Sequence, residues 1–152
     1  MFKAEDKQTK DTVAVKVITK DKNTTPKIIT DEKKLLRLLS GCECASGLIA
    51  LYEDDSKYML VLEYVPGVDM MTFIKLGLEL SEEQQKQLLR DVLHCILKCH
   101  QMKVWHRDIK PHNIILDIDQ KPKLIDFGLA TQPQNCLEQH PGKCGTIGYM
   151  AP

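Results

Sequence analysis

The sequence lacks an excess of either charge, because its 21 basic and 21 acidic residues give a formal net charge of +0. A balanced chain has no overall field that draws it to nucleic acid or to a membrane surface, so we predict neither partner. It also lacks an apolar run near the roughly 20 residues of a membrane span, and its first ten residues (MFKAEDKQTK) have no apolar signal-peptide core. We therefore expect an intracellular chain in the cytoplasm, with the nucleus as the alternative.

The cysteines lack the C-x-x-C spacing of structural zinc motifs. Of the six, Cys42 and Cys44 form a C-x-C, while Cys95 and Cys99 stand one helical turn apart, each beside a histidine. A zinc site is therefore the less favoured interpretation, and reduced thiols packed as small apolar residues are the favoured one. The rest of the composition is that of a folded domain, since 43% hydrophobic and 28% charged residues argue against disorder.

The first half of the chain is rich in strand patterns. Residues 12–18 (TVAVKVI) are mostly apolar and β-branched, which predicts a strand. A helix is predicted from Glu32 to Leu39, where four leucines form a broad apolar face, and Gly41 ends it. Residues 48–52 and 58–65 predict two antiparallel strands joined by a polar turn, with a Pro-Gly pair ending the second strand.

A long helix leads the second half. Ser81 and Gln84 form a capping-box pattern, and apolar residues then recur at helical spacing through His100. Short strands are predicted near residues 114–116 and 123–125, on either side of a polar turn. The remaining residues are rich in glycine and proline, which predicts an extended, irregular loop.

These patterns together predict an α+β fold in one domain of two lobes. Residues 1–65 form the strand-rich lobe, residues 66–69 the linker, and residues 70–152 the helix-led lobe. A cleft between two such lobes is a natural nucleotide site.

Two short blocks carry the chemistry. Residues 106–113 read HRDIKPHN, and 13 residues beyond Asn113 comes the triplet Asp126-Phe127-Gly128. At this spacing the blocks resemble the active-site signature of the eukaryotic protein kinases, and a lysine two residues after the first aspartate resembles the serine/threonine type. The resemblance implies a two-lobed kinase-like fold and ATP-dependent, Mg²⁺-dependent phosphoryl transfer to serine or threonine of a protein substrate.

The same resemblance implies a role for each catalytic-loop residue. Asp108 would orient the substrate hydroxyl or accept its proton, Lys110 would stabilise charge on the transferred phosphoryl group, and Asn113 would bind a metal ion. Asp126 would bridge the β- and γ-phosphates through Mg²⁺, a hard cation that suits oxygen ligands. His106 would hold the loop by packing and hydrogen bonding.

The strand at residues 13–16 (VAVK) resembles the one that delivers the nucleotide-binding lysine of kinases, so Lys16 would reach the α- and β-phosphates. Glu32 would pair with Lys16 and orient it. Its neighbour Asp31 competes for this role, and an acid at a helix start has an ordinary dipole explanation. Both alternatives stay open in the sequence.

Residues 60–67 (LVLEYVPG) resemble the hinge between kinase lobes. The backbone of Glu63 and Val65 would then bond the adenine edge, Leu62 would guard the rear pocket, and Asp69 would lie near the ribose hydroxyls. The residues implied to bind the nucleotide are Lys16, Glu32, Ala14, Glu63, Val65, Asp69, Ile115 and Asp126.

Residues 143–152 resemble the end of a kinase activation segment, in which Thr146 would contact the catalytic aspartate and lysine. Arg107 is of the kind that pairs with a phosphate on this segment. The segment offers Thr131 as its one hydroxyl before Thr146. Phosphorylation of Thr131 would then switch the segment. The alternatives are that Glu138 mimics a phosphate, or that the segment is not switched in this way.

We expect a domain truncated at both ends. Residues 1–10 contain no glycine, whereas a kinase domain opens with a glycine-rich hairpin, and the chain stops inside a further family motif. Large apolar residues such as Leu88, Leu93 and Ile96 would then forgo about 1.5–3 kcal/mol each through incomplete burial. The apolar surface that they expose invites a partner, a chaperone or aggregation. The alternative function is a catalytically inactive, kinase-like module that acts by regulatory or competitive binding.

Overall fold

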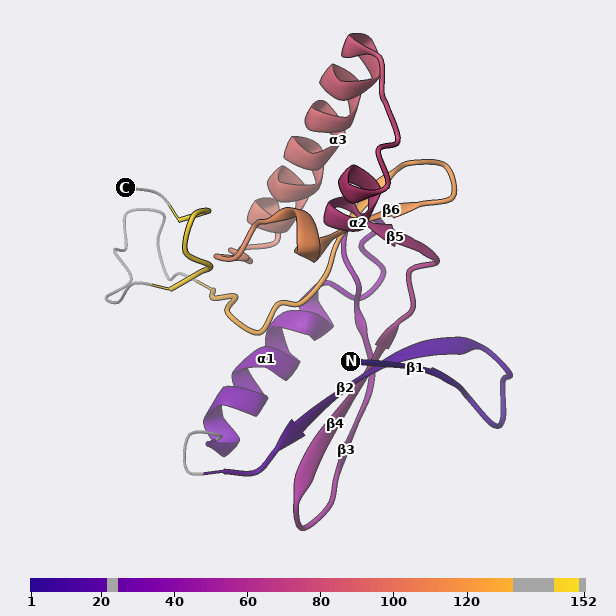
Figure 1. The fold of residues 1–152 in the computed structure, drawn as a ribbon. Helices are drawn as coiled ribbons and strands as arrows, with labels where there is room; N and C mark the ends of the chain where they lie inside the picture. Colours follow the sequence, from indigo (N-terminus) through magenta and orange to yellow (C-terminus); the bar gives the residue numbers. More distant parts are fainter. Residues whose placement is uncertain (22–24, 133–143, 151–152) are drawn as a thin grey trace. The chain divides into compact units, whose positions relative to one another are not determined.

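The computed structural model describes residues 1–21, 25–132 and 144–150 (Figure 1). The chain divides into two compact units. Residues 1–42 and 46–64 form the first unit, and residues 43–45 and 65–152 form the second. The linker predicted from the sequence lies beside the junction at residue 65, but nothing in the sequence indicated that residues 43–45 join the second unit.

The first unit is built on a four-stranded antiparallel sheet in the order β1-β2-β4-β3. Its strands are β1 (Phe2–Glu5), β2 (Thr12–Thr19), β3 (Leu48–Glu53) and β4 (Lys57–Glu63). The predicted strands β2, β3 and β4 are confirmed, although β4 ends two residues earlier than expected. Strand β1 was not predicted, because its four residues are mostly exposed and it is defined by its pairing with β2.

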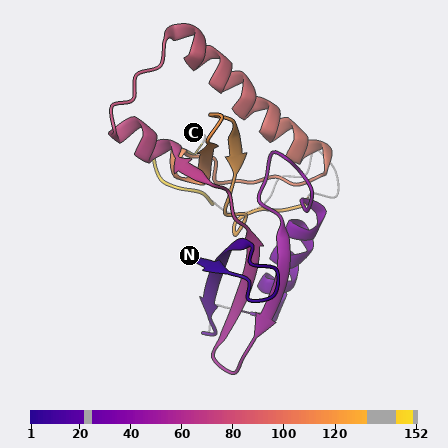
Figure 2. The same cartoon turned by 90° about the vertical axis from the view of Figure 1, so that its right-hand side faces the viewer.

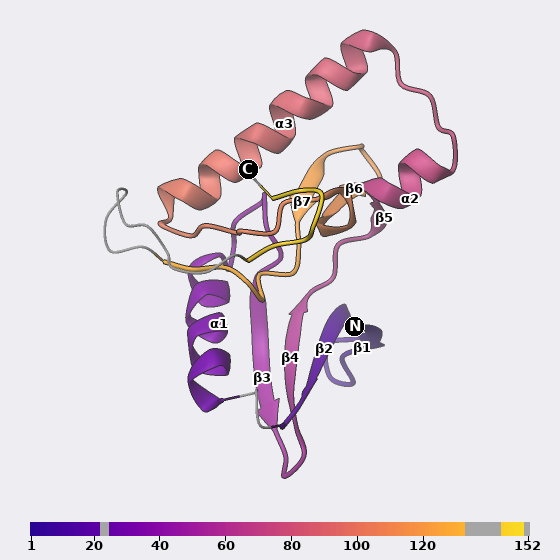
Figure 3. The same cartoon turned by 60° about the vertical axis from the view of Figure 1, so that its left-hand side comes forward.

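Helix α1 (Pro26–Leu38) lies beside β3 in the first unit (Figure 3). It begins six residues before the predicted start at Glu32, so that prediction was wrong. The start signal is Thr25, whose hydroxyl accepts a hydrogen bond from the Ile28 N–H, followed by proline at the first helical position. Glu32 therefore lies in the middle of the helix, and the dipole explanation for an acid at a helix start does not apply to it.

The core of the first unit lies between α1 and one face of its sheet. Leu35 and Leu36 are buried on the helix, and Leu60 is fully buried on the central strand β4. Lys16 is the cross-strand neighbour of Leu60, so the lysine stands on the same face of the sheet as this core. The sheet thus carries Lys16 on its helix-covered side.

The second unit contains a three-stranded antiparallel sheet in the order β5-β6-β7. Its elements are β5 (Gly67–Asp69), α2 (Met70–Lys75), α3 (Glu82–Gln101), the 3-10 turn η1 (Pro111–Asn113), β6 (Ile114–Asp117) and β7 (Pro122–Leu124). Helix α3 packs on β7, and a loop joins α2 to α3 (Figure 2). Two antiparallel sheets with packed helices confirm the predicted α+β class.

The start of α3 confirms the predicted capping box. The Ser81 hydroxyl accepts from the Gln84 N–H, and the Gln84 side chain accepts from the Ser81 N–H. The short elements β5 and α2 were not predicted, because three and six residues are too few to show a hydrophobic period.

Gly67 begins β5, which corrects the prediction that the Pro-Gly pair ends the preceding strand. Gly67 pairs with Asp117 of β6. A Cβ atom on Gly67 would lie 2.1 Å from the carbonyl oxygen of Leu116, a distance that no side chain can accept. Glycine is therefore required here by the close approach of two backbones.

The cysteines of the described residues are free thiols. Cys44, Cys95 and Cys99 are buried, and the Cys95 Sγ donates to the Pro122 carbonyl at 3.2 Å. Within the described ranges, no group of three or more metal-binding side chains could hold an ion. The helices of these ranges include none that combines the length and apolar character needed to cross a membrane.

Candidate active site

Asp108 is the centre of a hydrogen-bonded cluster in the second unit. Its Oδ2 accepts from the Lys110 Nζ at 2.8 Å and from the Asn113 Nδ2 at 2.9 Å. Its Oδ1 accepts from the Thr146 hydroxyl at 2.7 Å, and the same hydroxyl accepts from Lys110 at 2.6 Å. The structure therefore brings together the three candidate catalytic residues, and it confirms the expected contacts of Thr146.

The charge of Asp108 follows from these contacts. Burial raises its pKa, but the hydrogen bonds from Lys110, Thr146 and Asn113 outweigh burial, and the pKa lies below the ordinary value of 3.8 for an aspartate. Asp108 is thus a carboxylate at neutral pH, paired with the ammonium of Lys110. An anionic oxygen and a cation within 3 Å suit a reaction in which a hydroxyl is deprotonated and negative charge develops beside it.

His106 anchors the loop that carries Asp108. The ring is buried, and its Nε2 lies 2.8 Å from the Ile125 carbonyl while its Nδ1 accepts from the Asp108 N–H at 3.2 Å. This pattern requires the neutral ring with its proton on Nε2. Burial lowers the pKa of His106, which also favours the neutral form. The predicted structural role of His106 agrees with these contacts.

Two residues at the site hold a left-handed backbone. Arg107 has φ 63° and Asp126 has φ 57°, a region that residues with side chains seldom occupy. Arg107 also donates from Nε to the Leu129 carbonyl at 2.7 Å. Trp105 and Thr131 exchange two backbone hydrogen bonds, so the loop is tied on both sides to the segment after Asp126.

Asn113 and Asp126 are the candidate metal ligands. The Ile125 N–H donates to the Asn113 carbonyl at 3.0 Å, which places the two residues on adjacent segments. Because the Asn113 Nδ2 donates to Asp108, its amide oxygen is the atom left for a cation. An amide oxygen and a carboxylate fit Mg²⁺, which prefers oxygen ligands.

In the first unit, Lys16 pairs with Glu32. The Lys16 Nζ lies 2.8 Å from the Glu32 Oε1, and the two side chains are 20% and 6% exposed. Asp31 is exposed on α1. The structure therefore pairs Glu32 with Lys16, while the role of both toward a nucleotide stays a prediction.

The hinge residues fall in different units, Glu63 at the end of the first and Val65 at the start of the second. The Glu63 N–H donates to the Gly47 carbonyl at 3.0 Å, and the Glu63 carbonyl accepts from the Ser46 hydroxyl at 2.9 Å. These two partners of Glu63 were not predicted, because nothing in the sequence from 42 to 47 indicates them. Leu62 is buried.

Asp69 has a local role that the sequence analysis also missed. Its side chain caps α2, with Oδ1 accepting from the Thr72 N–H at 3.0 Å and Oδ2 from the Thr72 hydroxyl at 2.6 Å. The Thr72 hydroxyl is the main reason why the pKa of Asp69 is lowered. An N-cap pattern of aspartate followed three residues later by threonine was the available signal.

The two remaining nucleotide candidates lie on strands of different units. Ala14 of β2 stands opposite Leu62, and Ile115 of β6 stands between Asp69 and Lys123. Their contacts with a nucleotide stay predictions. Glu138 and the ends of the motif at residues 143–152 lie outside the described residues.

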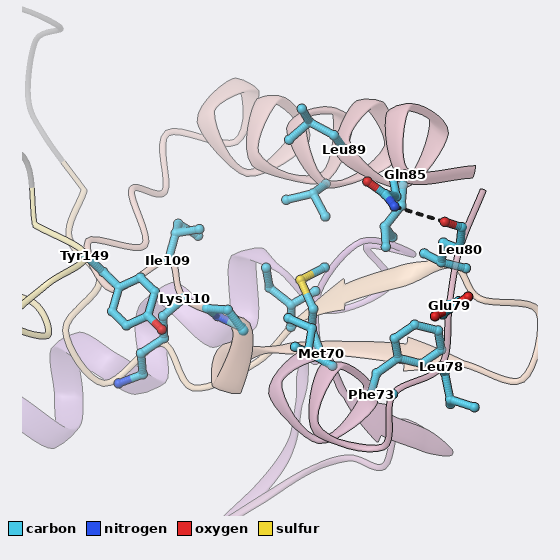
Figure 4. A pocket seen from close by; sticks show the side chains of 16 residues that line it. Met70, Phe73, Leu78, Glu79, Leu80, Gln85, Leu89, Ile109, Lys110 and Tyr149 are labelled. Atoms are coloured by element: carbon cyan, nitrogen blue, oxygen red, sulfur yellow. Dashed lines mark hydrogen bonds between the residues drawn. The ribbon is translucent and has the colours of Figure 1, made fainter. Parts of the chain in front are cut away.

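A large cavity of about 820 Å³ lies within the second unit (Figure 4). Its walls come from α2, the loop after it, α3 and η1, and they are mostly apolar, with Phe73, Leu89 and Ile109 among them. Lys110 is the one candidate catalytic residue in its lining. Leu93, on the same helix as Leu89, is also more than half exposed, which agrees with the predicted apolar surface.

Comparison with known proteins gives the family. The chain matches the protein kinase domain over residues 1–152. It belongs to this family.

Relatives of the chain are serine/threonine kinases. It is 33% identical over 143 residues to the maternal embryonic leucine zipper kinase of Xenopus laevis, covering 92% of this chain and 22% of the relative. It is 39% identical over 102 residues to the serine/threonine-protein kinase cds1 of Schizosaccharomyces pombe, covering 67% and 22%. With the CBL-interacting serine/threonine-protein kinase 24 of Arabidopsis thaliana the identity is 30% over 152 residues, covering 98% and 34%. The chain thus spans about a fifth to a third of these relatives.

Proposed function

We propose that the chain is the nucleotide-binding and catalytic part of a serine/threonine protein kinase, with the two-lobed kinase fold. It would transfer the γ-phosphoryl group of ATP to a serine or threonine hydroxyl of a protein. The observation that carries this proposal is the cluster of Asp108, Lys110, Asn113 and Thr146, in which an anion, a cation and a hydroxyl already meet at hydrogen-bond distance.

Asp108 would act on the acceptor hydroxyl. As a carboxylate it accepts a hydrogen bond from a hydroxyl at Oδ1, the position now taken by Thr146. An acceptor hydroxyl at this oxygen would be oriented for attack on the γ-phosphorus. Its proton would pass to Asp108 as the new P–O bond forms, while the bond from the γ-phosphorus to the bridging oxygen breaks and ADP leaves. Lys110 would neutralise the negative charge that develops on the phosphoryl oxygens.

The metal would be held by oxygen atoms of this chain. The amide oxygen of Asn113 and the carboxylate of Asp126 are the groups that would bind Mg²⁺, and the ion would neutralise phosphate charge when bound. The left-handed backbone at Asp126 is the kind of conformation that clusters at functional sites.

Nucleotide binding would also use the first unit. Lys16, held by Glu32, would contact the α- and β-phosphates as a compact charge. Ala14 and the backbone of Glu63 would meet the base, together with Val65 and Ile115 of the second unit. Asp69 would meet the ribose hydroxyls. The intracellular, cytoplasmic location stays a prediction from the sequence.

The test compares ligand binding with phosphoryl transfer. We expect Mg-ATP to raise the melting temperature of the purified chain, since a ligand that binds the folded state stabilises it. ³²P transfer from ATP to a generic basic protein is expected, and Asp126→Asn and Asp108→Asn should abolish it. Asp119→Asn, an exposed aspartate in the β6–β7 turn, is the matched control and should leave transfer intact. The proposal is rejected if Mg-ATP does not stabilise the wild-type chain and the wild-type chain transfers no ³²P.

The apolar cavity favours a second candidate, a regulatory or competitive binding module without transfer. Exposed apolar patches of this kind often mark a protein contact. This candidate predicts Mg-ATP binding without ³²P transfer, together with capture of a partner that Leu89→Asp on the cavity wall prevents.

A further inference from the structure

Glu63, the last residue of β4, is held at three atoms by two consecutive residues. Its carbonyl accepts from the Ser46 hydroxyl at 2.9 Å, and its N–H donates to the Gly47 carbonyl at 3.0 Å. Its carboxylate Oε2 accepts from the Gly47 N–H at 3.3 Å. All three residues belong to the first unit.

These bonds decide what the Glu63 backbone can still offer. A carbonyl oxygen has two lone pairs, and one of them is engaged by Ser46. The single N–H is engaged by Gly47. The backbone of Glu63 therefore has one acceptor site left for a ligand, and its own donor is already used.

The Ser46–Gly47 pair has little freedom to move away. Ser46 is 3% exposed. A Cβ added to Gly47 would lie 2.7 Å from the Ser40 Cα, so the two backbones touch. The Ser40 hydroxyl in turn lies 3.1 Å from the Leu48 carbonyl, next to Gly47, and 3.3 Å from the Leu36 carbonyl of α1. The Ser46 hydroxyl is thus a fixed donor, anchored through this contact to the end of α1.

We propose that Ser46 is a positioning residue, which sets the preference for the nucleotide base through the Glu63 carbonyl. By holding the Glu63 carbonyl as an acceptor, while Gly47 occupies the Glu63 N–H, it selects a base that presents an amino group, as adenine does. A base with a keto oxygen in that place would be repelled, because both that oxygen and the Glu63 carbonyl oxygen carry a negative partial charge. This inference rests on the proposed function, in which the Glu63 backbone meets the base, and it adds the residue that sets the carbonyl's orientation.

The effect of removing the hydroxyl follows from one neutral hydrogen bond. Ser46→Ala frees the Glu63–Tyr64 peptide to rotate. The amino group of adenine then loses an aligned acceptor, and a keto oxygen on another base is no longer held against the Glu63 carbonyl. We expect the ratio of the Kd for inosine triphosphate to the Kd for ATP to fall roughly fivefold, the factor that one such bond supplies.

The experiment measures both dissociation constants with Mg²⁺ on the full chain. Inosine triphosphate is the probe because it differs from ATP at the base, a keto oxygen in place of the amino group. Ser46→Thr restores the hydroxyl and should restore the ratio. Ser56→Ala is the matched control, since it also removes a serine hydrogen bond in the first unit, at 2.9 Å to Asp54 in the β3–β4 turn, and its ratio should equal that of the wild type.

If the ratio of the two dissociation constants is unchanged in Ser46→Ala, or if both nucleotides lose affinity equally, the inference is overturned. The proposed function still stands in that case, provided that the wild type binds ATP. If the wild type binds neither nucleotide, the proposed function fails and the inference falls with it. Should Ser46→Ala not fold, Ser46→Cys keeps the volume with a weak donor, and the same fall of the ratio is required of it.

Discussion

Neutralising Glu32 tests whether its pair with Lys16 holds the first unit together. Glu32→Gln keeps the shape of the side chain and removes its charge, so the ion pair with the Lys16 ammonium is lost in a site where the two side chains are 20% and 6% exposed. The matched control is Asp31→Asn, the same charge change one residue earlier on the exposed face of α1.

The magnitude lies between two limits. Exposed ion pairs contribute about 0–1 kcal/mol, and breaking a fully buried pair costs about 3–5 kcal/mol because a charge is left buried. With one partner buried and the other mostly so, we expect Glu32→Gln to lower the free energy of unfolding by about 2 kcal/mol. For a chain of this length that corresponds to a fall in melting temperature of roughly 4–8 °C.

Thermal unfolding followed by circular dichroism measures this fall, with and without Mg-ATP. Asp31→Asn should stay within about 0.5 kcal/mol of the wild type, as surface changes usually do. The loss in Glu32→Gln should persist at roughly 0.5 M salt, because buried charges are screened little. Equal melting temperatures of the two variants, or a loss that salt removes, would refute the assignment of a buried, structural pair.

Three further predictions concern the second unit. Gly67→Ala should lower the free energy of unfolding by about 1–3 kcal/mol, as overpacking does, because the new Cβ would lie 2.1 Å from the Leu116 oxygen. Chemical denaturation measures this loss. A loss no larger than that of Val68→Ala contradicts the prediction. Thr72→Val should reduce the acid sensitivity of the fold, because the stability that comes from the lowered pKa of Asp69 is present above its ordinary value of 3.8 and is lost as the pH falls through the folded pKa. Free energies of unfolding at about pH 6 and about pH 3 test this prediction. If the free energy of unfolding falls between these pH values as much in Thr72→Val as in the wild type, or more, the prediction is wrong. Thr146→Val should raise the pKa of Asp108 by removing a hydrogen bond to its carboxylate, so the acid limb of the pH–activity profile moves to higher pH. If the acid limb does not move, Thr146 does not set the pKa of Asp108.

Local patterns were enough for the longer elements of the fold. The run from 12 to 18 and the capping box at Ser81 predicted β2 and α3 because each signal lies within the element itself. The start of α1 was placed too late, at Glu32, although Thr25-Pro26 is a helix start. Strand β1 and helix α2 escaped prediction because short elements depend on what they pair with or cap.

The candidate site divides in the same way. Asp108, Lys110 and Asn113 were predicted from the sequence because they lie within six consecutive residues, so one loop brings them together. The competition between Asp31 and Glu32 stayed open, since both are acids at adjacent positions. Their different burial on α1, a consequence of how the helix packs, decided in favour of Glu32.

The sequence by itself thus determined the family, the α+β class and the candidate catalytic residues that one loop brings together, because these depend on short-range spacing. Only the tertiary structure decided the distant contacts that no motif indicates. Thr146 reaches Asp108 across 38 residues, a contact that the family resemblance implied, but Ser46 reaches the Glu63 carbonyl across 17 residues and nothing in the sequence indicated it. Outside a motif, a hydroxyl in a sequence gives no sign of the carbonyl that it will meet, because that choice is made by the packing of the chain and by the need to satisfy polar groups that it buries.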